Sequence, residues 1–242
     1  MTQLLLHRCW NSLWPDTPPG SAQYVWNMLE RVYSEPGRHY HNLWHIHDMV
    51  KLLGDCHLHL LGSDEQRRAI MIAAFFHDAV YEPGSQENEE KSAALFASIA
   101  DELRCESSVR EYTRRLILIT KHHFNRPDNL GLQEHLFLDV DLEILSATPD
   151  RYDSYARGIR AEFSSLSDEV YDTSRLGFLE GVSHNPTIYW TRELGSRGEW
   201  DARSNVMTEI NQIRERQSRR LHQAFSDDVE EKTRPRMAGG KR

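Results

Sequence analysis

Hydrophobic residues recur along much of the chain at steps of three and four positions, which is the spacing of one face of an α-helix. The alternation of apolar and polar residues that marks a strand is scarce. The clearest helical stretches are residues 25–32, 43–53, 95–99 and 152–163. The pattern therefore predicts an all-α fold.

Local signals for helix starts agree with this periodicity. Two capping-box patterns and one threonine-proline start are present, at Ser63 with Gln66, Ser108 with Glu111 and Thr148 with Pro149. The breaks between the periodic segments are too short for an interdomain linker. We expect one compact helical bundle over residues 1–225 and a disordered C-terminal tail over residues 226–242, where the apolar periodicity ends.

Composition narrows the class of protein. A chain of 242 residues can bury a substantial core without disulfides or a structural metal. Its three cysteines have no C-x-x-C spacing, which indicates a reducing compartment, by default the cytoplasm. The N-terminal apolar run is too short for a signal peptide or a membrane span, so we expect no membrane partner. A formal net charge of -8 argues against a nucleic-acid polymer as partner but leaves room for a small anion. The oligomeric state stays open.

Titratable residues gather in the segment YHNLWHIHDMV, residues 40–50. If this segment is helical, His41, His45 and Asp48 share a face other than the apolar one, and His47 lies off that face. One face is typical of a core-packing helix, whereas the other is suited to chemistry.

A second group of polar residues follows the nearly continuous apolar run from Ala69 to Phe76. A run that is apolar on every side predicts a helix buried in the centre of the protein. Its end carries His77 and Asp78, and an unpaired charge there would be costly. A divalent cation is the natural compensator, because histidine nitrogen and carboxylate oxygen together suit zinc, iron, manganese and similar ions.

Two further segments offer the same kinds of side chain. His122 and His123 follow an apolar helix, and Asp139 and Asp141 lie in the apolar segment FLDVDLEIL. Histidine and aspartate delivered from several buried helix ends are what a metal site in a helical bundle requires. Spacing alone does not decide between Asp139 and Asp141.

The order of these segments, His, then His-Asp, then Asp, resembles the HD superfamily of metal-dependent phosphohydrolases. The resemblance implies an HD-type helical domain in which His45, His77, Asp78 and Asp141 bind a divalent metal, with Asp139 as the alternative to Asp141. The segment YHNLWHIHDM is also similar to the Y-H-N-x-x-H-A-x-D-V motif of cyclic-nucleotide phosphodiesterases, which implies that His41 is a proton donor. A narrower resemblance, carried by segments such as FFHDAVYEP and YARGIRAEF, is to the bacterial group of predicted metal-dependent HD superfamily phosphohydrolases.

The number of metal ions follows from one departure from the family pattern. Two-metal phosphodiesterases have H-D-x-x-H, and this chain has Tyr81 in place of the last histidine. We therefore expect one tightly held ion, with zinc, iron, manganese, nickel, cobalt and magnesium not distinguished. A second ion would need Glu89, His122 or His123. For these three residues the alternative is a plain helix end, where acidic residues suit the N-terminus and histidines the C-terminus.

These expectations lead to a function. A bound divalent metal activates water for attack on a phosphate ester, a monoester or a diester, of a nucleotide or related small metabolite. His41 and Asp78 are the expected catalytic residues, with His41 giving a proton to the leaving alkoxide. Arg38, Lys121 and His123 are the candidates for binding the substrate phosphate. The alternative is a non-catalytic metal- or nucleotide-binding regulatory protein, against which His41 argues because binding alone needs no proton donor.

Overall fold

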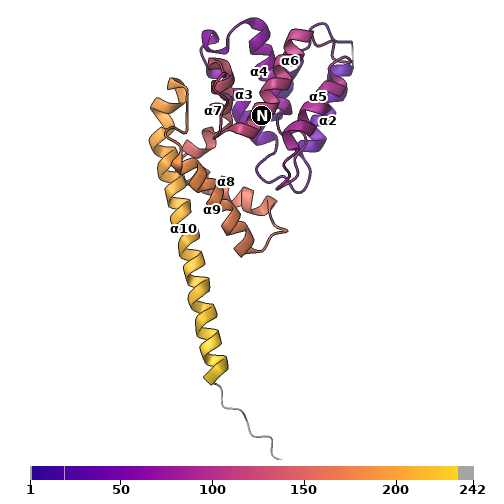
Figure 1. Cartoon of the computed structure of the whole chain (residues 1–242). Coiled ribbons are helices and arrows are strands. Elements are labelled where there is room, and N and C mark those ends of the chain that lie inside the picture. The colour runs from indigo at the N-terminus through magenta and orange to yellow at the C-terminus, as the bar shows by residue number, and fades with distance from the viewer. Residues whose placement is uncertain (1, 19, 234–242) are drawn as a thin grey trace, which may run out of the picture.

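The fold is described by a computed structural model that covers residues 2–18 and 20–233 and contains helices but no strand within those ranges (Figure 1). The α-helices are α1 (Thr2–Ser12), α2 (Ser21–Tyr33), α3 (Leu43–Asp55), α4 (Asp64–Phe76), α5 (Asn88–Ile99), α6 (Ser107–Ile119), α7 (Leu132–Asp141), α8 (Pro149–Glu162), α9 (Asp168–His184) and α10 (Arg192–Thr233). The short 3-10 helices are η1 (Leu58–Leu61), η2 (Thr120–His122) and η3 (Glu143–Ser146). The predicted all-α fold is confirmed.

Two of the three predicted helix starts form where the sequence indicated. Ser63 accepts a hydrogen bond from the backbone N–H of Gln66, whose side chain accepts one from the backbone N–H of Ser63, so the capping box begins α4. Pro149 is the first residue of α8. The third start is different, because α6 begins at Ser107 and has no side-chain cap.

Helix α4 is the central helix of the N-terminal part of the fold. It contacts α3, α5, α6 and α7, which together surround it (Figure 1). Between Ala69 and Phe76 every residue except Met71 is buried. The prediction of a helix apolar on all sides is therefore confirmed, and the residues that follow Phe76 enter a sheltered region.

The buried hydrophobic residues form two clusters that meet near the end of α7. The first cluster is built by α1 to α7 and includes Val140, whereas the second is built by η3 and α8 to α10 and includes Leu142. Leu194 at the start of α10 packs against both clusters. Asp141 therefore lies where the chain passes from one apolar cluster to the other.

The C-terminal helix differs from the predicted tail. The tail was expected from residue 226, but α10 continues to Thr233, and residues 234–242 lie outside the described residues. Figure 1 shows the last part of α10 projecting beyond the other helices, and Leu221 and Phe225 on it are exposed. A projecting helix needs no apolar face, because charged residues of good helix propensity and pairs such as Glu215 with Arg219 support it.

Two expectations from composition concern the whole chain. None of the helices in the described ranges combines the length and the apolar character that crossing a membrane requires. Cys9, Cys56 and Cys105 are free thiols. The fold is therefore held together by packing and by polar networks.

Candidate metal centre and active-site cavity

Three of the predicted metal ligands converge from α3 and from the end of α4. The Nε2 atoms of His45 and His77 are 3.1 Å apart, and Oδ2 of Asp78 lies 3.0 Å from Nε2 of His77 and 3.7 Å from Nε2 of His45. One ligand atom from each residue lies within 4.8 Å of the others. His45, His77 and Asp78 can therefore hold a metal ion together.

Asp141, at the end of α7, lies next to the two histidines of this group. Its Oδ1 atom lies 3.1 Å from Nε2 of His45 and 3.5 Å from Nε2 of His77. Ligand atoms that are each about 2.1 Å from a common tetrahedral ion are about 3 to 3.5 Å from one another. The separations between the histidine nitrogens and the carboxylate oxygens, 3.0 to 3.7 Å, lie near that spacing, so these donors suit a small divalent cation.

Hydrogen bonds on the outer side of each imidazole set its orientation. Nδ1–H of His77 donates to the carbonyl of Ala74 at 3.1 Å, so its Nε2 lone pair points into the cluster. Nδ1 of His45 is hydrogen-bonded to the hydroxyl of Tyr40 at 3.2 Å. Such outer contacts fix the tautomer and ring position that a metal-binding histidine needs.

The cluster concentrates negative charge in a buried place. Burial by itself lowers the pKa of His77, but Asp78 and Asp141 outweigh it and raise that pKa well above its ordinary value. Burial raises the pKa of each carboxyl, yet His77 outweighs it and holds the pKa of Asp78 and that of Asp141 below the usual range. Both carboxylates are therefore ionised at neutral pH, and a cation would compete with the His77 proton for this position.

Asp139, the alternative to Asp141, belongs to a different network. Its carboxylate pairs with Arg126 at 2.8 Å and accepts hydrogen bonds from the backbone of Trp190 and from the backbone and hydroxyl of Thr191, just before α10. Residues two positions apart on a helix point about 200° from each other. The structure therefore turns Asp141 toward the histidines and Asp139 toward the start of α10.

His41 lies next to the cluster but outside the helix that carries His45. Helix α3 begins at Leu43, and the Asn42 side chain caps it by accepting from the backbone N–H of Trp44. Nδ1–H of His41 donates to Oε2 of Glu162 at 2.7 Å. The expected shared helical face of His41 and His45 is thus absent, and a cap residue separates the two positions instead.

Glu162, the last residue of α8, anchors the whole His41 segment. Its Oε1 atom accepts hydrogen bonds from the backbone N–H groups of Tyr40 and His41 at 2.7 and 2.9 Å. Burial by itself lowers the pKa of His41, but Asp78 and Glu162 outweigh it and raise that pKa above its ordinary value. The protonated form of His41 is therefore favoured near neutral pH. Because Nδ1 is bonded to Glu162, Nε2 is the ring nitrogen that can give up a proton.

Tyr81 stands where the two-metal pattern has a histidine, and it contacts His41. The two rings stack with centroids 4.1 Å apart and an interplanar angle of 29°. The Tyr81 hydroxyl donates to Oε2 of Glu162 at 3.0 Å, so Tyr81 and His41 share one carboxylate oxygen. In this chain the tyrosine thus fixes the position of His41.

The two proposed phosphate-binding cations lie elsewhere. The guanidinium of Arg38 donates to the backbone carbonyls of His41, Asp78 and Ala79 at 2.6 to 3.2 Å, so it joins the two motif segments. Lys121 donates to the Gln86 carbonyl and to Glu90. Neither residue lines the cavity described below, and nearby carbonyl and carboxylate oxygens already bind both cations.

His123 and Glu89 do face the cavity. Nε2–H of His123 donates to Oδ2 of Asp141 at 2.9 Å, which leaves Oδ1 of Asp141 directed to the other histidines. His122 is not among the lining residues of the cavity. Asp48, which was expected on the same helix face as His41 and His45, pairs with Arg151 at 2.8 Å and with Nδ1 of His47 at 3.1 Å.

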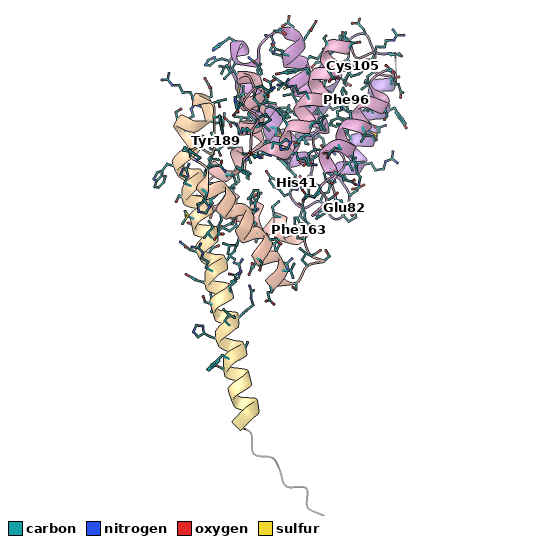
Figure 2. The ribbon with its side chains drawn as sticks, viewed as in Figure 1. His41, Glu82, Phe96, Cys105, Phe163 and Tyr189 are labelled. Carbon is teal, nitrogen blue, oxygen red and sulfur yellow. The ribbon has the colours of Figure 1, made fainter. Side chains whose placement is uncertain are left out.

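A cavity of about 430 Å³ opens beside the cluster, between the N-terminal helices and the pair α8 and α9. His41, Asp78, His123 and Asp141 line one part of it. Figure 2 shows His41 on the side of the N-terminal helices that faces α8, and Phe163 at the end of α8. This volume is within the usual range for small-molecule sites.

Glu162 is the site residue that sequence reasoning missed. It continues the helix face of Tyr155 and Ile159, both buried, at steps of four and three positions. A carboxylate on an otherwise apolar helix face indicates a buried partner, and that signal was present in the segment YARGIRAEF. The partner, His41, could not be identified from the pattern.

Comparison with protein-family models, with curated proteins and with solved structures found no match to this chain. The arrangement of side chains at the cavity is therefore the basis for assigning a function. It combines a cluster that could hold a metal ion, an imidazole that a buried carboxylate orients, and a cavity of small-molecule size.

Proposed function

We propose that the protein is a metal-dependent phosphohydrolase that cleaves a phosphate ester of a small metabolite, with nucleotides as the class suggested by the HD-superfamily resemblance. One observation carries the proposal. The Nε2 atoms of His45 and His77 lie 3.1 Å apart and 3.0 to 3.7 Å from carboxylate oxygens of Asp78 and Asp141. These two aspartates line a cavity, beside an imidazole that a buried carboxylate orients. A cluster that served folding alone would not need the proton-carrying His41 at its edge.

The residues have distinct parts in the proposed reaction. A divalent ion held by His45, His77, Asp78 and Asp141 would polarise a phosphoryl oxygen and lower the pKa of water. Asp78, which also lines the cavity, places its charge beside the reacting phosphate and so counts as catalytic with His41. Nε2 of His41 supplies the proton to the leaving alkoxide, while Glu162 holds the ring and stabilises its charged form.

His123 is the remaining candidate for contact with the phosphate. It lines the cavity and its ring is tied to Asp141, so it can face a phosphoryl oxygen at a fixed position. Arg38 supports the site indirectly, since its guanidinium holds the His41 and Asp78 segments together. We propose one metal ion, because Tyr81 occupies the position of the further histidine and bonds to Glu162.

One experiment distinguishes the proposed enzyme from the alternative, a regulatory binding protein. Metal-stripped protein is reloaded with single divalent ions, and each form is assayed against phosphomonoesters, phosphodiesters and nucleotides. The proposal predicts turnover that depends on the ion. If every loaded form is inert while one phosphate compound binds tightly, the protein is a binding module and the enzyme proposal is wrong.

We propose the cytoplasm as the cellular location. The free thiols are compatible with the reducing cytoplasm that the sequence suggests. A small phosphate ester is the proposed partner. A nucleic-acid polymer is not proposed, because the formal net charge is -8.

A further inference from the structure

The part of the cavity contributed by α8, α9 and residue 124 is rich in aromatic side chains. Its aromatic lining consists of Phe124, Tyr155, Phe163, Tyr171 and Phe178. Phe178 is 40 % exposed, and Phe124 and Phe163 are only half-buried. Phenylalanine rings that line a cavity without being buried in the core offer a contact surface to a ligand.

These aromatic residues form one wall of the cavity. On one side, a series of contacts connects this wall to the proposed metal ligand His45. Tyr40, whose hydroxyl bonds to His45, packs edge to face on Tyr155 with centroids 4.7 Å apart. The Arg175 guanidinium then lies over Tyr155 and over Phe178, 5.1 Å from each ring centroid. The wall thus runs from His45 to α9 through packed planar groups.

On the opposite side of the cavity, a second series of ring contacts connects α9 to the proposed metal ligand Asp141. Phe178 packs edge to face on Phe124 at 5.6 Å, and the Phe124 ring lies 6.2 Å from that of His123. His123 in turn binds Asp141. A ligand whose phosphate reached the cluster would therefore place its ester group against this aromatic wall.

The charges on this aromatic wall limit how many phosphate groups a bound molecule can carry. Among the described residues that line the cavity, Arg175 is the one arginine, and there is no lysine. Glu209 binds this arginine through both carboxylate oxygens at 2.8 and 3.0 Å, and the Tyr155 hydroxyl accepts from it at 3.2 Å. Its charge is therefore neutralised, and no cation remains on this wall for a second phosphate group.

We propose that the cavity selects monophosphate esters whose alcohol carries a ring, with the ring packed among Phe124, Phe163 and Phe178, and that it disfavours di- and triphosphates. The inference rests on the proposed function, since it assumes that the phosphate lies at the cluster. Stacking on aromatic faces tolerates many rings, so the preference is for the presence of a ring rather than for one compound.

A binding measurement tests the ring preference without turnover. Protein loaded with Mn²⁺ is titrated by calorimetry with 1-naphthylmethylphosphonate and with methylphosphonate. We expect the naphthyl compound to bind about tenfold more tightly or better, because burying an aromatic ring removes its apolar surface from water. Equal affinity for the two compounds would overturn the proposal.

The position of the ring is tested by a matched pair of variants. Phe178→Ala should weaken binding of the naphthyl compound about five- to tenfold and leave the affinity for methylphosphonate unchanged. Phe225→Ala removes an exposed phenylalanine from the projecting part of α10 and should change neither affinity. Since Phe178 is 40 % exposed, its truncation should leave the fold intact, which circular dichroism checks. Loss of both affinities, or of neither, in Phe178→Ala would contradict the assigned position.

The charge preference is tested by displacement of the bound naphthyl compound. Adenosine 5′-monophosphate should displace it at about one tenth of the concentration that adenosine 5′-diphosphate requires, and the reverse order would overturn the exclusion of a second phosphate. Failure of the proposed function gives a different result. Protein that hydrolyses no ester but binds the naphthyl compound through Phe178 retains the inference, whereas turnover with no ring preference refutes the inference alone.

Discussion

Nδ1 of His41 lies 2.7 Å from Oε2 of Glu162, across 121 positions of sequence. The same carboxylate binds two backbone N–H groups and the Tyr81 hydroxyl. A glutamate with four such contacts holds the imidazole in one orientation and favours its protonated form. Helix α8 therefore contributes to the proposed chemistry although none of the proposed metal ligands lies on it.

We expect Glu162→Gln to lower kcat about 10- to 100-fold while the bound metal is retained. Loss of the carboxylate charge should also lower the pKa of His41. Because His41 acts as an acid, activity is lost as pH rises through its pKa, so the alkaline limb of the pH–rate profile should move to lower pH. Glu169→Gln, at an exposed position on α9, is the control. A purely structural role would lower activity without moving that limb.

His41→Ala should keep its metal and lose about 100- to 10,000-fold in turnover of an alkyl phosphate. The loss should be much smaller with 4-nitrophenyl phosphate, because 4-nitrophenolate leaves without a proton. Elemental analysis and the two rate constants check this. Equal losses with both substrates would remove the proton-donor role.

The two aspartates near the end of α7 should behave differently. Asp141→Asn is expected to lose metal, because its carboxylate contacts both histidine Nε2 atoms. Asp139→Asn should retain metal and lower the free energy of unfolding by about 3 to 5 kcal/mol, since it leaves buried Arg126 unpaired. Metal content and chemical denaturation distinguish the two, and metal loss in Asp139→Asn alone would reverse the assignment.

His77→Ala and Asp78→Ala should each be purified with little or no metal. Each substitution removes one of the four proposed metal ligands, and the remaining three would hold the ion less tightly. The charges that stay buried would then lack a compensating partner. Elemental analysis of the purified variants is the measurement. Full retention of metal in both variants would show that the ion, if bound, lies elsewhere.

Asp172 links α9 to α10 and gives a pH-dependent contribution to stability. Burial by itself raises the pKa of Asp172, but hydrogen bonds from Arg216 and Arg220 outweigh it and hold that pKa below the ordinary value. The contribution is therefore present above the unfolded pKa of about 3.9 and is lost as pH falls through the folded pKa.

Asp172→Asn should accordingly be less stable by about 1 to 3 kcal/mol at pH 7. The difference from the unmodified protein should shrink as pH falls below about 4. Thermal unfolding at several pH values measures it, with exposed Asp153→Asn as control. A difference that stays constant down to pH 2 would contradict the ion-pair explanation.

Much of the fold was predictable because its determinants are local. The capping box at Ser63, the proline at the start of α8 and the all-apolar run before His77 each depend on residues within a few positions of one another. Such signals place a helix and show which of its faces is buried. The apolar run also led to His77 as a residue at a buried helix end, whereas His45 was indicated by the family resemblance.

Tertiary structure decided what local pattern leaves open. Asp139 and Asp141 have the same apolar neighbourhood in sequence, and only the packing of α7 between two cores turns Asp141 to the histidines. Arg38 and Lys121 looked available to a phosphate until the fold brought carbonyl and carboxylate oxygens to them.

The sequence by itself determined that helices form, which faces are apolar and which segments carry histidine and aspartate, because these follow from side-chain chemistry at a spacing of three and four residues. The tertiary structure alone decided which of those polar groups meet. Glu162 with His41, and Tyr81 beside both, are contacts between distant segments that depend on how α8 docks against the N-terminal helices. No periodicity encodes that docking, because it arises from the packing of whole helix faces.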